Sequence, residues 1–253
     1  MTSRVETRTP LQGSGYFLDS GDLDEIKKWR EVIGGITTNQ LILFEKQGIQ
    51  NVPAHLNLIC ETVGDKFPVS VELPDSSWPV EKMFTLALQY HEAHPSNTVI
   101  KVPILSDDVK GLKLIHKLAT RGVRINATIG INFGQLTLAA EAARAYSDHG
   151  VSYISLFWGR AIESFERDKE GLMPQQLLEA TLTYLSNHNL CNTRVIIGSI
   201  RKPEQVVEAF SQGAEIVTVP PTILGQLLHN KRAQETVDEF DQAFRKHAVK
   251  ITL

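Results

Sequence analysis

The feature that most constrains the fold is a regular alternation of short β-rich runs with longer helical segments. The helical segments repeat apolar residues at helical spacing, as in 79–93 and 133–150. Eight strand–helix units in about 250 residues are typical of a (β/α)8 barrel. We therefore predict an α/β, single-domain (β/α)8 TIM barrel. The eight predicted strands cover residues 16–19, 34–38, 69–73, 98–104, 123–129, 152–157, 194–199 and 215–220.

The domain organisation follows from the same pattern. Residues 1–15 are polar and glycine-containing, so we expect a loosely ordered N-terminal segment before a barrel domain over 16–253. The long connection 39–68 is expected to hold two helices. Residues 232–248 form an amphipathic pattern beyond the last unit, which predicts an extra C-terminal helix.

Composition excludes several classes of protein. The chain is 42% hydrophobic and 22% charged with a net charge of −3, which gives no reason to expect nucleic-acid binding. No apolar run approaches the ~18 residues of a membrane span. Cys60 and Cys191 are too few for a disulfide framework, which favours a reduced, cytoplasmic setting. The histidines lack metal-ligand spacing, and we expect no metal and no cofactor. The sequence does not set the oligomeric state, and a homo-oligomer is one possible assembly.

A lysine stands in the middle of one apolar run. Lys101 lies within NTVIKVPIL (97–105), which otherwise suits a strand that is buried on both faces. An ammonium buried without a partner costs several kcal/mol or more, so such groups usually lower their pKa. The position therefore indicates a chemical role.

Other polar residues gather at the corresponding strand ends. In a barrel the carboxyl ends of the strands line the active site. Seven of the eight predicted strands place a polar group at or near this end, which indicates one shared site. These residues are Asp19, Asn39, Glu72, Lys101, Asn126, Thr128, Ser155, Arg160, Ser199 and Arg201.

Taken singly, each of these residues also fits a structural role. Asp19 fits a turn or a cap, and Asn39 fits a helix cap. Lys101 fits a side chain that reaches out of the barrel mouth. Arg160 and Arg201 fit solvated surface pairs with acidic neighbours, namely Glu163 and Glu204.

The set also fits one kind of chemistry. A neutral lysine amine can attack a carbonyl and form a Schiff base, which stabilises the carbanion left by carbon–carbon cleavage. Asp19 or Glu72 can serve as the acid/base for the hydroxyl protons. Arg160, Ser199 and Arg201 suit a phosphate, because guanidinium groups bind phosphate bidentately. Donors suited to substrate hydroxyls are Asn39, Asn126 and Ser155.

The combined motifs resemble those of the transaldolase family, class I Schiff-base aldolases. The resemblance runs from the first predicted strand to the seventh and follows the family order. The matching pieces are FLDSGDL (17–23), GITTN (35–39), VSVE (69–72), VIKVPI (99–104), INATIGINFGQ (125–135), ISLFWGR (154–160) and GSIRKPEQ (198–205).

The resemblance implies a role for each residue. Lys101 is the Schiff-base lysine and Asp19 the acid/base at the hydroxyl whose deprotonation breaks the bond. Glu72, with a water held by Thr128, assists carbinolamine dehydration and iminium hydrolysis. The implied ligands of the dihydroxyacetone unit are Asn39, Asn126 and Ser155, and those of the acceptor phosphate are Arg160, Ser199 and Arg201.

Departures from the family pattern leave the substrate open. Leu156 replaces a proline and Trp158 a smaller residue, and the stretch 161–173 is atypical. Phe157 stands where the fructose-6-phosphate aldolase branch tends to have tyrosine, and Arg201 where it tends to have lysine. Both favour transfer of a dihydroxyacetone unit between sugar phosphates. The alternatives are an aldolase acting on fructose 6-phosphate or an unusual sugar phosphate, and a non-catalytic sugar-phosphate-binding barrel.

Overall fold

Eight parallel strands close into a barrel in the computed structural model, which describes residues 13–105, 108–147 and 149–247. Each strand pairs with the next, and the last pairs with the first. This confirms the predicted (β/α)8 fold. The strands are β1 (Gly15–Asp19), β2 (Gly35–Thr37), β3 (Val69–Glu72), β4 (Thr98–Pro103), β5 (Ile125–Gly130), β6 (Ser152–Phe157), β7 (Thr193–Gly198) and β8 (Ile216–Val219).

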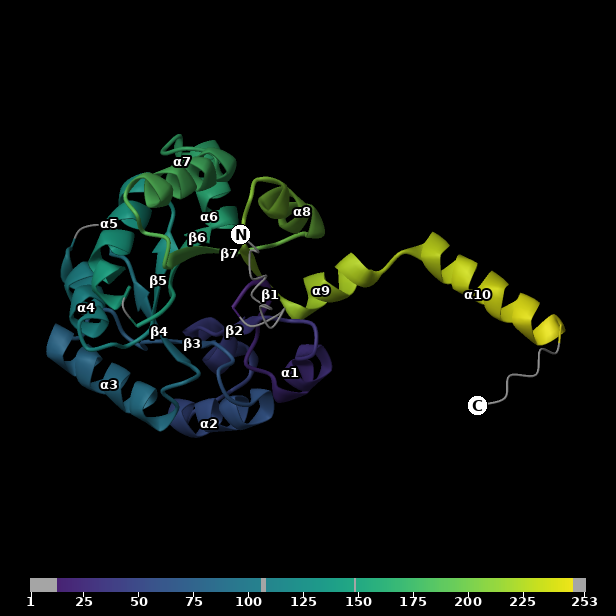
Figure 1. Cartoon of the computed structure of the whole chain (residues 1–253), viewed down its shortest axis with the longest axis horizontal. Coiled ribbons are helices and arrows are strands. Elements are labelled where there is room, and N and C mark those ends of the chain that lie inside the picture. Colours follow the sequence, from purple (N-terminus) through teal and green to yellow (C-terminus); the bar gives the residue numbers. More distant parts are fainter. Residues whose placement is uncertain (1–12, 106–107, 148, 248–253) are drawn as a thin grey trace, which may run out of the picture.

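Helices surround the barrel (Figure 1). The α-helices are α1 (Leu23–Trp29), α2 (Val52–Val63), α3 (Val80–Ala93), α4 (Lys110–Ala119), α5 (Phe133–Ala143), α6 (Trp158–Glu163), α7 (Pro174–Asn187), α8 (Pro203–Ser211), α9 (Pro221–Leu228) and α10 (Lys231–Lys246). Short π- or 3-10-helical turns are η1 (Leu41–Lys46), η2 (Arg144–Tyr146) and η3 (Ser164–Asp168). The long connection after β2, expected to hold two helices, holds one α-helix, α2, preceded by the short π-helical segment η1.

Local sequence signals set where several helices begin. The side chain of Asp22 caps α1 by accepting hydrogen bonds from the backbone N–H groups of Asp24 and Glu25. Asn132 caps α5 in the same way through Gln135. Proline occupies the first turn of α2, α7, α8 and α9, where its missing N–H has no intrahelical partner to lose.

The barrel interior is layered. Toward the amino ends of the strands lies an apolar layer, whose members are Phe17, Val99, Tyr153, Ile196 and Ile216. Side chains two residues further along a strand share the same face, and at these positions the chain places Asp19, Lys101 and Ser155. The apolar layer therefore closes the interior beneath a polar layer. A larger apolar cluster fills the shell between strands and helices.

Several boundaries differ from the prediction. The helix expected over 106–121 begins at Lys110, and residues 106 and 107 lie outside the described residues. The helix expected over 133–150 ends at Ala143 and continues only as the short turn η2. The sequence did not predict α6 and η3, because they are short and η3 has no buried side chain to give an apolar period.

The two ends of the barrel domain differ. Of the predicted N-terminal segment, residues 1–12 lie outside the described residues, while the backbone N–H of Gly13 donates to the carbonyl oxygen of Gly34 at 2.8 Å. The predicted extra helix is α10, which stands away from the barrel beyond α9 (Figure 1). None of its residues is buried. Within the described ranges, no helix is long and apolar enough to cross a membrane.

Candidate active site

A buried ion pair lies inside the barrel. Lys101 Nζ is 3.2 Å from Glu72 Oε2, and the two side chains are 5% and 10% exposed. The parallel register of β3 and β4 places these residues directly side by side, both facing inward. Lys101 Nζ also donates a hydrogen bond to the carbonyl oxygen of Thr38 at 3.1 Å. The lysine thus has a carboxylate counter-ion and a backbone acceptor, rather than standing unpartnered in an apolar strand.

A chain of buried hydrogen bonds crosses the neighbouring strands. Ser155 Oγ donates to Asn126 Oδ1 at 2.6 Å, and Asn126 Nδ2 donates to Ser70 Oγ at 3.2 Å. Asn126 is the register partner of Lys101 on β5. All three polar side chains are buried. The chain fixes the Asn126 amide beside the lysine, where it can present a hydrogen-bond group to a bound molecule.

Asp19 ends β1 and is held by a second polar cluster. Thr37 Oγ1 donates to Asp19 Oδ1 at 2.7 Å. The Thr37 hydroxyl also contacts Thr218 Oγ1 at 2.6 Å. Asp19 itself is half-buried at the carboxyl end of its strand, so one carboxylate oxygen is oriented by Thr37 while the group still faces the mouth of the barrel.

The end of β5 carries an unusual polar atom. Thr128 Oγ1 is buried and has no hydrogen-bond partner among the described residues. The next residue, Ile129, has φ +68°, and the β5–β6 register shifts between Ala127 and Gly130. A β-branched residue in this region of φ is strained, and such strain gathers at functional sites. The shift places a free hydroxyl acceptor near the lysine strand.

The remaining predicted substrate ligands lie at the rim. Phe157, at the end of β6, has its ring centroid 6.0 Å from Lys101 Nζ. Asn39 follows β2, and its Oδ1 accepts a hydrogen bond from the backbone N–H of Ile42 at 2.9 Å. Its carbonyl oxygen therefore serves as a helix cap, which leaves the amide nitrogen for any contact with a ligand.

Both predicted phosphate-binding arginines contact one carboxylate. Arg160 Nη1 is 3.0 Å from Glu163 Oε2, and Arg201 Nη1 contacts Glu163 Oε1. The hydrogen bonds from Arg201 and Arg160 hold the pKa of Glu163 below its ordinary value. The Arg160–Glu163 pair that the sequence offered as a structural role is present. Arg201, in contrast, pairs with Glu163 and not with Glu204.

A close backbone contact joins the start of α6 to the residue that follows β7. A Cβ atom on Gly159 would lie 2.5 Å from the carbonyl oxygen of Ser199, so only glycine fits there. The backbone N–H of Gly159 donates to that same oxygen at 3.2 Å. Ser199 has φ +59°. This contact places the serine hydroxyl in the same loop cluster as Arg160 and Arg201.

Several contributors were not among the predicted site residues. The side chains of Thr37, Ser70 and Thr218 contact the predicted groups or one another, and only a period-two count along each strand could have found them. Thr38 contributes its backbone carbonyl oxygen, which no side-chain pattern indicates. Trp158, which replaces a smaller residue of the family pattern, is fully buried in the main core. It therefore packs at the start of α6 and does not line the mouth of the barrel. No group of three or more metal-ligating side chains occurs within the described ranges.

The arrangement defines a class of protein. A lysine amine, two carboxylates and oriented amide and hydroxyl groups lie together at the carboxyl end of a closed barrel, where (β/α)8 enzymes carry their active sites. Such a set can add an amine to a carbonyl and move protons on the adduct.

Comparison with known proteins agrees with this class. The family model described as Transaldolase/Fructose-6-phosphate aldolase matches residues 16–252. A probable transaldolase of Chlorobium phaeobacteroides (strain BS1) is 33% identical over 233 residues, covering 89% of this chain and 95% of the relative. One of Syntrophobacter fumaroxidans is 32% identical, covering 91% and 96%. One of Thermodesulfovibrio yellowstonii is 33% identical, covering 91% and 98%. The chain belongs to the transaldolase/fructose-6-phosphate aldolase family and is an enzyme of this group.

Proposed function

We propose that the enzyme transfers a dihydroxyacetone unit between sugar phosphates through a Schiff base on Lys101. The observation that carries the proposal is the buried pair of Lys101 with Glu72. The Glu72 carboxylate can take a proton from the Lys101 ammonium group. This leaves a neutral amine, whose lone pair can attack the C2 carbonyl of a ketose. The family relatives named probable transaldolase support the same activity.

The proposed reaction proceeds by proton transfers at defined atoms. The Lys101 amine adds to C2, and Glu72, with a water on Thr128 Oγ1, protonates the leaving hydroxyl so that an iminium forms. Asp19 removes the C4 hydroxyl proton, the C3–C4 bond breaks, and its electron pair flows to the iminium nitrogen. The aldehyde leaves, and the enamine adds to an acceptor aldehyde, whose oxygen receives the proton back from Asp19. Water, assisted by Glu72, then hydrolyses the new iminium, which releases the product ketose and returns the free Lys101 amine.

The polar layer suits the three-carbon unit. Asn126, fixed by Ser155, can bind a hydroxyl next to the iminium, and the Asn39 amide nitrogen can bind another. The acceptor's phosphate would contact Arg160, Ser199 and Arg201. Because the arginines are about half exposed, at 59% and 47%, they can reach a ligand at the rim.

One observation favours a second candidate. Glu163 already holds both arginines, so a phosphate must displace or share a carboxylate. A site that binds an acceptor phosphate weakly would suit an aldolase, which cleaves its sugar-phosphate donor without transferring the ketol unit to a second sugar. Release of aldehyde from fructose 6-phosphate, with and without erythrose 4-phosphate, separates the two. A rate that does not depend on the acceptor supports the aldolase.

Borohydride trapping tests the shared mechanism. A ketose phosphate plus borohydride should add the mass of the reduced ketol adduct to the peptide that contains Lys101. Lys101→Met should abolish the adduct, and Lys113→Met, at an exposed position of α4, should leave it unchanged. Absence of any wild-type adduct with every ketose phosphate tried would contradict the Schiff base and favour the non-catalytic barrel.

Variants at the rim test the phosphate role. Arg160→Ala and Arg201→Ala should each raise KM for phosphorylated substrates about tenfold or more, since charge-assisted bonds to phosphate are lost. KM for dihydroxyacetone should stay unchanged. Equal effects on both substrates would argue against a phosphate site.

Assembly and location belong to the same proposal. α10 exposes an apolar stripe of Val237, Phe240 and Phe244, which share one helix face. We propose that this stripe joins copies of the chain in a homo-oligomer. We also propose a cytoplasmic location, which the free cysteines Cys60 and Cys191 support.

A further inference from the structure

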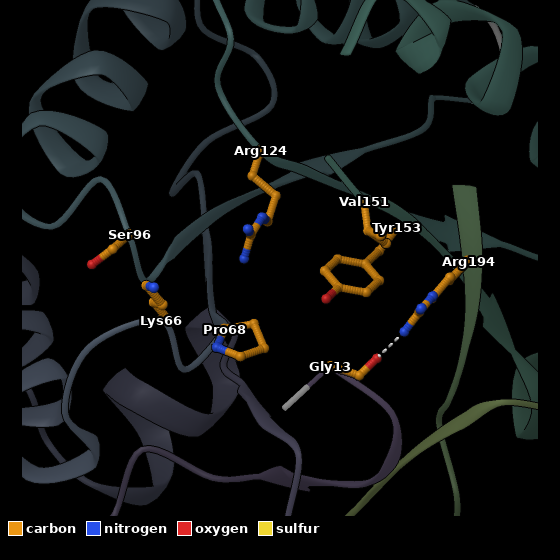
Figure 2. A pocket seen from close by; sticks show the side chains of 8 residues that line it. All are labelled: Gly13, Lys66, Pro68, Ser96, Arg124, Val151, Tyr153 and Arg194. Carbon is orange, nitrogen blue, oxygen red and sulfur yellow. Dashed lines mark hydrogen bonds between the residues drawn. The ribbon is translucent and has the colours of Figure 1, made fainter. Parts of the chain in front are cut away.

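The mouth of the barrel opposite the lysine pair holds a basic pocket. Its volume is about 430 Å³, and Figure 2 shows the side chains that line it. The pocket opens where strands begin, because most of its lining residues precede or start β1, β3, β4, β5, β6 and β7. The lining residues are Gly13, Lys66, Pro68, Ser96, Arg124, Val151, Tyr153 and Arg194.

The strand period separates this pocket from the catalytic end. Arg124 lies two residues before Asn126, and Tyr153 two before Ser155, so each shares the inward face of its strand. The apolar layer that contains Phe17 and Val99 lies between this mouth and the polar layer. A ligand here would therefore not touch Lys101.

The pocket carries unbalanced positive charge. Lys66, Arg124 and Arg194 contribute three cations, and no lining residue is acidic. Arg194 is satisfied, since its Nε is 3.3 Å from Glu215 Oε2 and its Nη1 donates to the Gly13 carbonyl oxygen at 2.7 Å. Within the described part of the chain, neither Lys66 nor Arg124 has a carboxylate within 4.0 Å.

The segment before Gly13 offers no net compensation. Residues 1–12 contain Arg4 and Arg8 but only one acid, Glu6. A cation cluster without a matching acid destabilises itself by mutual repulsion, and an anion relieves that repulsion.

A neutral hydroxyl completes the lining. Tyr153 is 2% exposed, and its phenol oxygen points into the pocket beside the Arg124 guanidinium (Figure 2). No described residue accepts a hydrogen bond from this hydroxyl. Burial raises the pKa of Tyr153, against the opposing effect of Arg124 and Arg194, so the phenol stays a donor. A charged donor, the Arg124 guanidinium, and a neutral donor, the Tyr153 hydroxyl, together suit the oxygens of a phosphate monoester.

We propose that this mouth binds the phosphate group of a small phosphorylated metabolite. Arg124 and Lys66 bind the phosphate oxygens, Tyr153 donates a hydrogen bond, and Pro68 and Val151 contact the carbon skeleton. The cavity volume lies within the roughly 300–1,000 Å³ of small-molecule sites, which is more than a bare phosphate needs. The inference is independent of the catalytic proposal, because none of these residues belongs to it.

Glycerol 3-phosphate is the probe, because it has no carbonyl and cannot form a Schiff base. The test uses the full chain carrying Arg160→Ala and Arg201→Ala, which removes the phosphate ligands proposed at the other mouth. Isothermal titration at constant ionic strength should show saturable binding of glycerol 3-phosphate and none of glycerol. Arg124→Gln in this background should weaken binding at least about tenfold. Lys113→Gln, on the exposed face of α4, should not change it.

Two further measurements keep the test decisive. Arg124→Gln removes no carboxylate partner, so the Tm without ligand should not fall. Tyr153→Phe removes only the hydroxyl and should weaken binding by a smaller factor, about threefold to tenfold. Absence of saturable binding in the doubly substituted background would overturn the proposal. So would binding that survives both Arg124→Gln and Tyr153→Phe unchanged.

Discussion

Lys101 Nζ and Glu72 Oε2 lie 3.2 Å apart inside a closed barrel, with side chains 5% and 10% exposed. Two opposite charges this deeply buried depend on each other, because each would be costly alone. The pair is therefore a structural element, and in the proposed reaction it also carries the proton transfers that amine chemistry needs. Changes to either partner should affect stability and activity in separable ways.

Removing one partner of this pair should destabilise the fold more than removing both. Glu72→Gln and Lys101→Met should each lower the free energy of unfolding by about 3–5 kcal/mol, since each leaves a buried charge unpaired. The double variant should recover much of that loss. Urea denaturation of the four proteins measures the coupling. Additive losses in the double variant would show that the two charges do not stabilise each other.

Thr128 should matter for activity and not for stability. Its Oγ1 has no partner within the described part of the chain, so Thr128→Val loses no hydrogen bond and should leave Tm unchanged or higher. kcat should fall by about 10²-fold if the hydroxyl positions the water used with Glu72. Thr128→Ser keeps the hydroxyl and is the matched control. A Thr128→Val enzyme with wild-type kcat would exclude this role.

Glu163 should oppose phosphate binding. Glu163→Gln removes the charge that occupies Arg160 and Arg201, so KM for a phosphorylated acceptor should fall by up to about fivefold. Because the arginines hold the pKa of Glu163 low, the carboxylate stays charged even at pH values somewhat below its ordinary pKa, and it loses this pairing only as pH falls through the lowered pKa. The wild-type competition should therefore persist at neutral pH. A higher KM in the variant would instead mean that Glu163 positions the arginines.

The two cysteines should differ in reactivity. Burial, with a smaller effect of Glu61, raises the pKa of Cys60 from 9.0 to about 12, whereas Cys191 is exposed. Iodoacetamide at pH 8 should modify Cys191 alone, and Cys60 only after denaturation, as read by peptide mass. The unfolded thiol releases its proton at lower pH than the folded one, so stability should decline as pH rises above about 9. Rapid native modification of Cys60 would contradict its burial.

The α10 stripe should control assembly without holding the barrel together. Phe240 and Phe244 are 69% and 48% exposed, so Phe240→Ser with Phe244→Ser should change stability by less than about 1 kcal/mol. Light scattering should show a smaller particle than the wild type. Val207→Ser, at a 59% exposed position of α8, is the matched control. Unchanged mass in the double variant would exclude the stripe as the contact between copies.

Strands were predictable because each buried strand reads as a short apolar run with β-branched residues. All eight predicted strands are present, with ends shifted by at most two residues. Helix ends were less predictable where a helix continues into a turn, as after Ala143, because the apolar pattern does not stop there. The helical segments α6 and η3 are too short to show a repeat of apolar residues at helical spacing, so the sequence did not predict them.

The sequence by itself determined the alternation that closes the barrel and the polar residues placed at its strand ends, because side-chain period and strand direction are local properties. Only the tertiary structure decided the partners. Glu72 meets Lys101 through the β3–β4 register, and Glu163 at the end of α6 meets Arg201 in the connection between β7 and α8. Arg124 and Lys66 share a mouth although 58 residues separate them in sequence. Such contacts depend on strand register and barrel closure, which no local pattern encodes.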